Sequence, residues 1–166
     1  MGNRKKKSRH KPDNARRIVP FLTVSAPGVS LAFYTSAFGF KPEHDEIITH
    51  PNGEIVHASM RYKGKTVVMF APEGAWSHPA KTPKHTGQPC PVGLYVYCDN
   101  VDMLYETALR HGAIANEPPS DAFWGDRVAR LDDPDGYTWT FATHVGRFAP
   151  LTMPGLEDEA AEAAVE

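Results

Sequence analysis

The sequence predicts an α+β protein made of two βαβββ modules that form a curved mixed sheet around a cleft. Short apolar runs rich in β-branched residues alternate with two helical segments, and the order strand, helix, three strands occurs twice. The two helical segments contain the related stretches "FYTSA" and "LYETA", 71 residues apart, which indicates an internal repeat. A sheet with a single helix buries only one face, so two modules are expected to pair and leave a cleft for a ligand.

The first module, residues 18–71, is predicted to begin with a strand in the apolar run "RIVPFLTV" at 17–24. A helix that ends near Gly39 is predicted next, from an apolar stripe at helical spacing that consists of Leu31, Tyr34 and Phe38. The stretches "FKPEHDEIITH", "EIVHASMRY" and "KTVVMFAP" are typical of three strands, and the turns at 51–53 and 63–64 separate them.

A linker at residues 72–90 is predicted between the modules. The stretch "PEGAWSHPAKTPKHTGQPCP" has five prolines and no periodicity, which favours a connecting loop. Its two histidines, His78 and His85, are interpreted as exposed loop residues because no metal-binding partners lie near them in the sequence.

The second module, residues 91–145, is predicted to start with the strand "VGLYVYC" and a helix at 99–112. Asn100 or Asp99 suits the N-cap of this helix, and Gly112 suits its end. "AIANEPP" is interpreted as a short strand broken by its two prolines. Two further strands flank the turn "DPDG", where proline and glycine both occupy favoured positions.

Charge is concentrated at the two ends of the chain. Residues 1–17 carry eight Lys or Arg against one acid and are predicted to be a basic disordered arm; residues 147–166 are predicted to be an acidic tail. The formal net charge of −2 and the acidic middle make nucleic-acid binding an unfavoured hypothesis, open only through the arm. The sequence shows no secretory signal, no membrane span and no cysteine framework, so a cytoplasmic protein without membrane contact is expected.

The repeat, and the "DPDG" turn followed by an aromatic strand, resemble the vicinal oxygen chelate superfamily. This group includes glyoxalase I, extradiol dioxygenases, fosfomycin-resistance enzymes and bleomycin-binding proteins, and the resemblance covers about residues 18–145. The sequence is most similar to a branch of small glyoxalase-like bacterial proteins, often linked by name to phosphonate operons, that carry "FWGDR" and then "DP.G..W..ATH". The matching residues are Phe123 to Arg127, then Asp133, Pro134, Gly136, Trp139, Ala142, Thr143 and His144.

The resemblance implies a metal site with two His or Glu ligands from each module. Aligning the helices and turns places the four positions on Val19, Met69, Gly93 and Thr140. These residue types do not form a site for a hard cation. No metal or other cofactor is therefore expected at the usual place, and a divalent metal held by other ligands, such as His57 or a residue of a second chain, is the alternative.

Strand alternation from the same four positions predicts which side chains face the cleft. The predicted ligand-binding residues are Phe21, Thr23, Ser59, Arg61, Tyr95, Tyr97, Trp124, Arg127 and Thr140. His57 is the candidate catalytic acid or base, because imidazole titrates near neutral pH; the alternative is a histidine that stabilises the sheet.

Two members of this set have competing interpretations. Arg127 would clamp a carboxylate, phosphate or phosphonate, and Trp124 would stack on a flat ligand. The alternative is a structural loop in which Asp126 pairs with a base, and His144 is interpreted as structural.

Taken with the resemblance, these residues predict a glyoxalase- or bleomycin-resistance-like protein that binds a small organic ligand in the inter-module cleft. Both neutral and anionic ligands are considered. If it is an enzyme, a glyoxalase-like lyase or isomerase is expected. The alternatives are a metal-dependent lyase, isomerase or dioxygenase of the same superfamily, and a nucleic-acid-associated protein acting through its basic arm. The resemblance also implies a homodimer, with or without exchange of modules.

Overall fold

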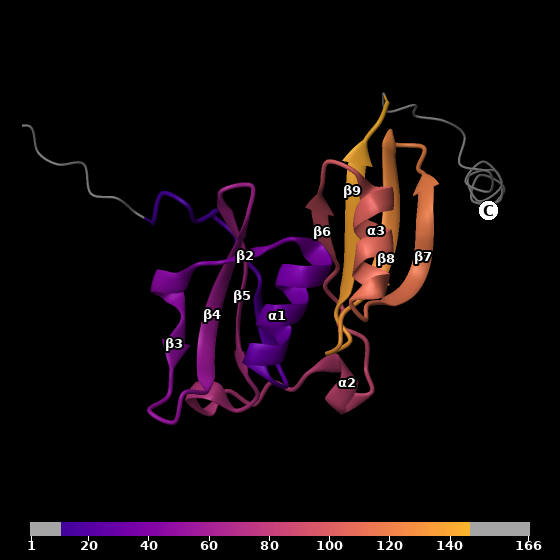
Figure 1. The fold of residues 1–166 in the computed structure, drawn as a ribbon. Coiled ribbons are helices and arrows are strands. Elements are labelled where there is room, and N and C mark those ends of the chain that lie inside the picture. Colours follow the sequence, from indigo (N-terminus) through magenta and orange to yellow (C-terminus); the bar gives the residue numbers. More distant parts are fainter. Residues whose placement is uncertain (1–10, 147–166) are drawn as a thin grey trace, which may run out of the picture.

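The protein, seen in a computed structural model that describes residues 11–146, consists of two modules with one mixed sheet each (Figure 1). The first sheet has the strand order β1-β5-β4-β2, with β3 paired to β4, and the second has the order β6-β9-β8-β7. The α+β class and the two βαβββ modules are confirmed, although the modules form two separate sheets. The predicted acidic tail and the first ten residues of the predicted arm lie outside the described residues.

The first module follows the predicted element order. Its elements are β1 (Phe21–Val24), α1 (Pro27–Phe38), β2 (Lys41–Pro42), the 3-10 helix η1 (His44–Glu46), β3 (Ile48–Thr49), β4 (Ile55–Tyr62) and β5 (Lys65–Pro72). β1 runs parallel to β5, and the other pairs are antiparallel. Helix α1 ends where predicted, because Gly39 adopts a left-handed conformation (φ 68°) and its N–H donates to the Tyr34 carbonyl.

Two predicted strands of this module are shorter in the structure. β1 begins at Phe21, because Pro20 has no N–H for the ladder, although its carbonyl accepts from the Met69 N–H at 2.9 Å. The predicted strand after α1 is divided into β2 and β3 by η1. The chain turns at Glu43, whose buried carboxylate accepts from Thr66 Oγ1 at 2.8 Å and from Asn14 Nδ2.

The second module contains β6 (Leu94–Tyr97), α3 (Val101–Arg110), β7 (Ile114–Asp121), β8 (Asp126–Asp132) and β9 (Thr138–His144). Asn100 is confirmed as the N-cap of α3, since its side chain accepts from the Met103 N–H at 2.9 Å. The prediction that prolines end the strand after α3 is wrong, because β7 continues through both. β7 is the outer strand of its sheet, where missing N–H groups are tolerated, and its register with β8 is irregular between Glu117 and Ser120.

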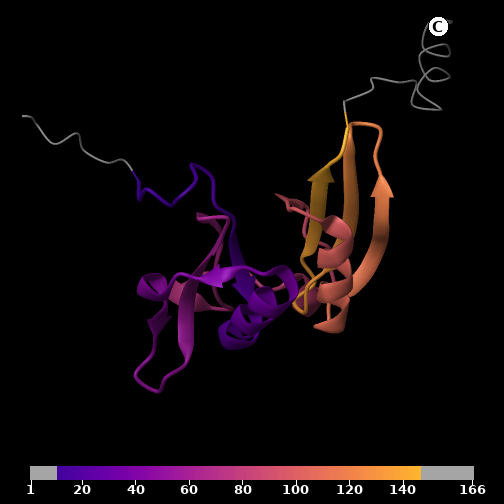
Figure 2. The same ribbon diagram turned by 45° about the horizontal axis from the view of Figure 1, so that its top comes forward.

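A single hydrophobic core joins the two modules. Figures 1 and 2 show α1 lying between the two sheets, and α1 packs against α3. Phe38 on α1 also packs against two aromatic side chains of β9, with ring centroids 5.4 Å from Trp139 and 4.7 Å from Phe141. The helix of one module therefore covers part of the other module's sheet, and this packing sets the relative position of the modules.

The "DPDG" turn between β8 and β9 connects the modules through hydrogen bonds. The buried Asp133 carboxylate accepts from Tyr34 Oη of α1 at 2.7 Å and from Trp139 Nε1 at 3.0 Å. Asp135 accepts from the Ser25 N–H at 3.1 Å and from Ser30 Oγ at 3.2 Å. This stretch therefore determines how the two modules meet.

The predicted connecting loop is partly ordered into short helices, the 3-10 helix η2 (Ala75–Ser77) and α2 (Pro83–Thr86). The Lys84 N–H donates to the Asp135 carbonyl at 3.0 Å, so α2 packs on the "DPDG" turn. Gly136 has a positive φ of 87°, and a Cβ atom there would lie 3.1 Å from Lys84 N. Glycine is required at this position by both its backbone conformation and the close approach of α2.

Candidate ligand site

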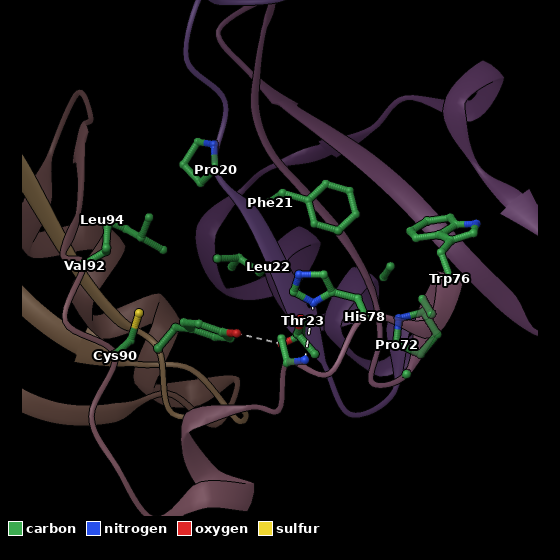
Figure 3. Close-up of a pocket in the computed structure, with 15 residues that line it drawn as sticks. Pro20, Phe21, Leu22, Thr23, Pro72, Trp76, His78, Cys90, Val92 and Leu94 are labelled. Atoms are coloured by element: carbon green, nitrogen blue, oxygen red, sulfur yellow. Dashed lines mark hydrogen bonds between the residues drawn. The ribbon is translucent and has the colours of Figure 1, made fainter.

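A cavity of about 580 Å³ opens between the modules, where β1, the end of β5, η2 and residues 90–94 meet (Figure 3). Its volume falls in the range of pockets that hold small organic molecules. The lining is mostly apolar and comprises Pro20, Phe21, Leu22, Thr23, Ala71, Pro72, Gly74, Ala75, Trp76, His78, Ala80, Cys90, Val92, Leu94 and Tyr137. No lysine or arginine is among these described lining residues.

Three aromatic rings gather at one side of this cavity. Phe21 of β1 stacks on His57 of β4 with ring centroids 5.8 Å apart, and Trp76 of η2 lies 6.2 Å from Phe21 and 6.1 Å from His57. Phe21 is 50% exposed and Trp76 is 66% exposed, so their faces are accessible to a ligand. We call these three residues the aromatic trio. Its members come from three elements that the sheet register and the η2 turn hold together.

The turn that carries Trp76 has an unusual backbone. Trp76 and Ser77 both have positive φ values, 50° and 60°, directly after Gly74 at φ 77°. A left-handed conformation at a bulky residue costs free energy, and it persists only where the surrounding structure imposes it. The turn therefore holds the indole at the cavity rather than in the hydrophobic core.

His57 is electrostatically suited to the neutral state. Burial lowers the pKa of its imidazole, and the more distant Glu46 carboxylate only partly opposes this effect. Its Nε2 lies 3.4 Å from Ser59 Oγ, and its buried Nδ1 has no hydrogen-bond partner among the described residues. A protonated ring would leave a buried N–H without an acceptor, so His57 stacks on Phe21 as an uncharged ring.

The opposite wall comes from the second module and the segment before β6. Figure 3 shows Cys90, Val92 and Leu94 across the cavity from Phe21. Tyr137 closes this wall, and its hydroxyl donates to the Thr23 carbonyl at 2.8 Å. Burial raises the pKa of Tyr137 to about 12, so this hydroxyl stays a neutral donor. The pocket therefore depends on both modules.

The structure divides the residues that the sequence predicted to bind a ligand. Phe21 and Thr23 line the cavity, and His57 and Ser59 lie directly behind Phe21. A second set lies on the face of the other sheet that points away from the core; it consists of Tyr95, Tyr97, Trp124 and Thr140. The structure thus forms two neighbouring surfaces rather than one continuous cleft. The binding role of each residue stays a prediction.

Two predicted arginines lie apart from both surfaces. Arg61 is exposed beside Lys63 and Gly64 at the β4–β5 hairpin, where a bulge interrupts the register. Arg127 lies on the other face of β8, and its guanidinium donates to Asp102 of α3 at 2.8 Å and to Asp121 at 2.9 Å. Strand alternation explains the placement of Arg127, because Asp126 takes the outward-facing position next to it.

Asp126 is the centre of the second surface. Its carboxylate is 3% exposed, and it accepts from Tyr95 Oη and Tyr97 Oη, both at 2.8 Å, and from His144 Nδ1 at 2.8 Å. The base that pairs with Asp126 is His144, whereas Arg127 and Arg130 pair with other carboxylates. The hydrogen bond from His144, more than any other interaction, lowers the pKa of Asp126. His144, interpreted from the sequence as structural, is therefore part of a polar cluster.

Sequence reasoning missed several pocket residues because they lie in the linker. Trp76, His78 and Cys90 belong to the stretch interpreted as a featureless connection. The only signal was a tryptophan two residues after a glycine in a polar segment. Periodicity carries no information in such a segment, so the positions of these side chains came only from the three-dimensional structure.

The four positions where metal ligands were considered do not form a donor set. Met69 supplies a thioether, Thr140 a hydroxyl, and Val19 and Gly93 supply no side-chain donor. Within residues 11–146, no three His, Cys, Asp or Glu side chains are arranged to hold a metal ion. The usual metal does not fit the residues present at the usual place, and no chemical step is derived through it.

The fold and the pocket define a class of protein, a two-module α+β domain with an apolar pocket between repeated βαβββ units. A model of the Glyoxalase/Bleomycin resistance protein/Dioxygenase superfamily matches residues 17–141, and the chain belongs to this superfamily. An uncharacterized protein of Mycobacterium bovis is 29% identical over 130 residues, which cover 76% of this chain and 82% of that protein.

Solved structures show the same fold. TioX from Micromonospora sp. ML1 is 24% identical with a TM-score of 0.58, covering 78% of this chain and 99% of that chain. A glyoxalase/bleomycin resistance protein/dioxygenase family enzyme from Burkholderia phytofirmans is 16% identical with a TM-score of 0.59, covering 80% of this chain and 98% of that chain. No described helix is long and apolar enough to cross a membrane.

Proposed function

We propose that this protein binds a small, flat and largely apolar organic molecule in the pocket between its two modules. The aromatic trio beside an apolar cavity of about 580 Å³ is the observation that carries this proposal. Aromatic rings recognise flat ligands by stacking, and the few polar groups of the lining orient such a ligand. The described lining has no lysine or arginine, so a neutral ligand fits better than the anionic one considered from the sequence.

The ligand experiment screens flat aromatic compounds by thermal shift and then measures affinity by calorimetry. Trp76→Ala removes one wall of the trio and should weaken binding of a hit about tenfold, the equivalent of ~1.4 kcal/mol. Met103→Ala, at an exposed position on α3, is the matched control and should leave affinity unchanged. A hit whose affinity is equal in wild type and Trp76→Ala would show that the ligand does not bind against the trio.

We further propose that binding occurs without the divalent metal found in other members of the superfamily. The donor-poor residues at the usual positions support this view. Elemental analysis of protein purified without chelator should show substoichiometric Ni, Zn, Mn and Fe. Stoichiometric metal that is lost in His57→Ala would contradict the proposal and would favour a metal-dependent lyase, isomerase or dioxygenase.

We also propose a cytoplasmic homodimer. Two large apolar side chains beside the edge strands are exposed, Ile18 just before β1 and Val92 just before β6. A second copy of the chain would cover these side chains. The free thiols of Cys90 and Cys98 support a reducing location.

A further inference from the structure

The cluster around Asp126 is built like a proton-transfer pair and lies outside the pocket between the modules. Asp126 and His144 are directly opposite each other in the β8–β9 register. Asp126 Oδ1 accepts from His144 Nδ1, while Oδ2 accepts from the hydroxyls of Tyr95 and Tyr97 on β6. Three strands therefore supply the four side chains that we call the Asp126 cluster.

The hydrogen bonds determine which nitrogen of His144 is available. The hydrogen bond from His144 is the main cause that lowers the pKa of Asp126, so the carboxylate is ionised and acts only as an acceptor. A neutral imidazole then carries its proton on Nδ1, and its Nε2 lone pair is free. The His144 side chain is 66% exposed, which leaves this lone pair accessible from solvent.

The two tyrosines donate hydrogen bonds to the Asp126 carboxylate and do not act as bases themselves. Burial raises the pKa of Tyr95 to about 12, and the hydrogen bond to Asp126 raises the pKa of Tyr97. Both phenols therefore stay protonated at neutral pH and donate to Oδ2. The arrangement follows the general rule that a carboxylate fixes the tautomer and orientation of an imidazole base.

The backbone around the cluster is held at both ends. The Val145 and Gly146 N–H groups donate to the Gly125 carbonyl at 2.9 and 3.0 Å, and the Ala122 N–H donates to the Asp126 carbonyl at 2.7 Å. These bonds connect the loop before β8 to the end of β9. His144 and Asp126 are thus preorganised by paired strands, as an acid–base pair requires.

An aromatic surface lies beside this pair. The rings of Tyr95 and Tyr97 have centroids 5.4 Å apart, and the half-buried Trp124 indole donates from Nε1 to Tyr95 Oη at 3.4 Å. Such a surface accepts a planar ring by stacking and would hold it within reach of His144.

We propose that His144 is a general base, positioned by Asp126, that removes a proton from a planar aromatic ligand with a weakly acidic C–H or O–H bond. His144 is the catalytic residue in this proposal, since its Nε2 touches the proton, and Asp126 is a positioning residue. The site is separate from the pocket between the modules, so it does not depend on the function proposed for that pocket.

The probe is 5-nitrobenzisoxazole, a planar compound with one acidic ring C–H. His144 Nε2 takes this proton, the C–H bonding pair forms the third bond of a nitrile, and the N–O bond breaks to give a coloured nitrophenolate. The imidazolium then returns its proton to water, and no other reactant is needed. The expected result is a rate at least ~100-fold above that of free imidazole at the same concentration and pH.

Substitutions separate the catalytic role from chance reactivity. His144→Gln should remove the activity, whereas His111→Gln, the matched control at an exposed histidine after α3, should retain it. A wild-type rate no higher than that of free imidazole, or a His144→Gln variant as active as wild type, overturns the proposal.

The positioning role is tested by the division between kcat and KM. Asp126→Asn should lower kcat about tenfold or more with little change in KM, while Trp124→Ala should raise KM with little change in kcat. Circular dichroism checks that each variant is folded. If Asp126→Asn does not fold, Tyr97→Phe removes one donor and keeps the ring, and an unchanged kcat in that variant would contradict the role given to the cluster.

Discussion

Asp133 has a buried carboxylate that helps to join the two modules. Its Oδ1 accepts from the N–H groups of Asp135 and Tyr137, both at 3.0 Å, and its Oδ2 accepts from Tyr34 and Trp139. Burial raises the pKa of Asp133, but these four donors hold the carboxylate in its buried position. A carboxylate can accept from all four donors, whereas a neutral side chain of the same shape cannot.

Asp133→Asn should therefore destabilise the fold. In either orientation the amide NH₂ would face two donors, and the expected loss in the free energy of unfolding is about 2–3 kcal/mol. Chemical denaturation monitored by circular dichroism measures this loss. Asp45→Asn, at an exposed position in η1, is the control and should change the free energy by less than ~0.5 kcal/mol. Equal stability of the two variants would contradict the role given to Asp133.

The lowered pKa of His57 predicts that the stability of the fold depends on pH. Burial lowers its pKa in the folded protein, so the unfolded chain binds the proton more readily. The contribution of His57 to stability is complete above the unfolded pKa of about 6.5 and is lost as the pH falls through the lower folded pKa. An NMR titration should show a ring resonance, absent in His57→Phe, with a midpoint below about 6.5. A midpoint at or above that value would show that the ring is not buried as described.

Elements were predictable from the sequence where periodicity or capping chemistry was local. The stripe through Tyr34 and Phe38, the Asn100 cap and the "DPDG" turn each depend on neighbours within a few residues. Elements whose form depends on distant contacts were not predictable. β7 continues through two prolines because it is an outer strand, and η2 takes its left-handed form within the tertiary structure; neither condition is visible in a short window.

The whole molecule shows why the candidate site was only partly predictable. Strand alternation puts Phe21 and Thr23 on one face of β1 and Tyr95 and Tyr97 on one face of β6, because the side-chain period of two holds along each strand. The alternation of side chains along one strand does not show how the faces of the two sheets lie relative to each other. The packing of α1 between the sheets opened a pocket lined by the linker and left the Asp126 cluster as a separate surface.

Exposed apolar side chains beside the edge strands predict that the protein forms a dimer. Ile18 is 85% exposed just before the edge strand β1, and Val92 is 62% exposed just before the edge strand β6. If a second copy covers this region, light scattering after gel filtration should give twice the mass of the chain, because burial of such side chains stabilises the association. Ile18→Asp should shift the mass toward that of one chain. Val29→Asp, at an exposed position on α1, should keep the dimer mass. If the wild-type protein stays monomeric even at high concentration, these side chains do not form a homodimer interface.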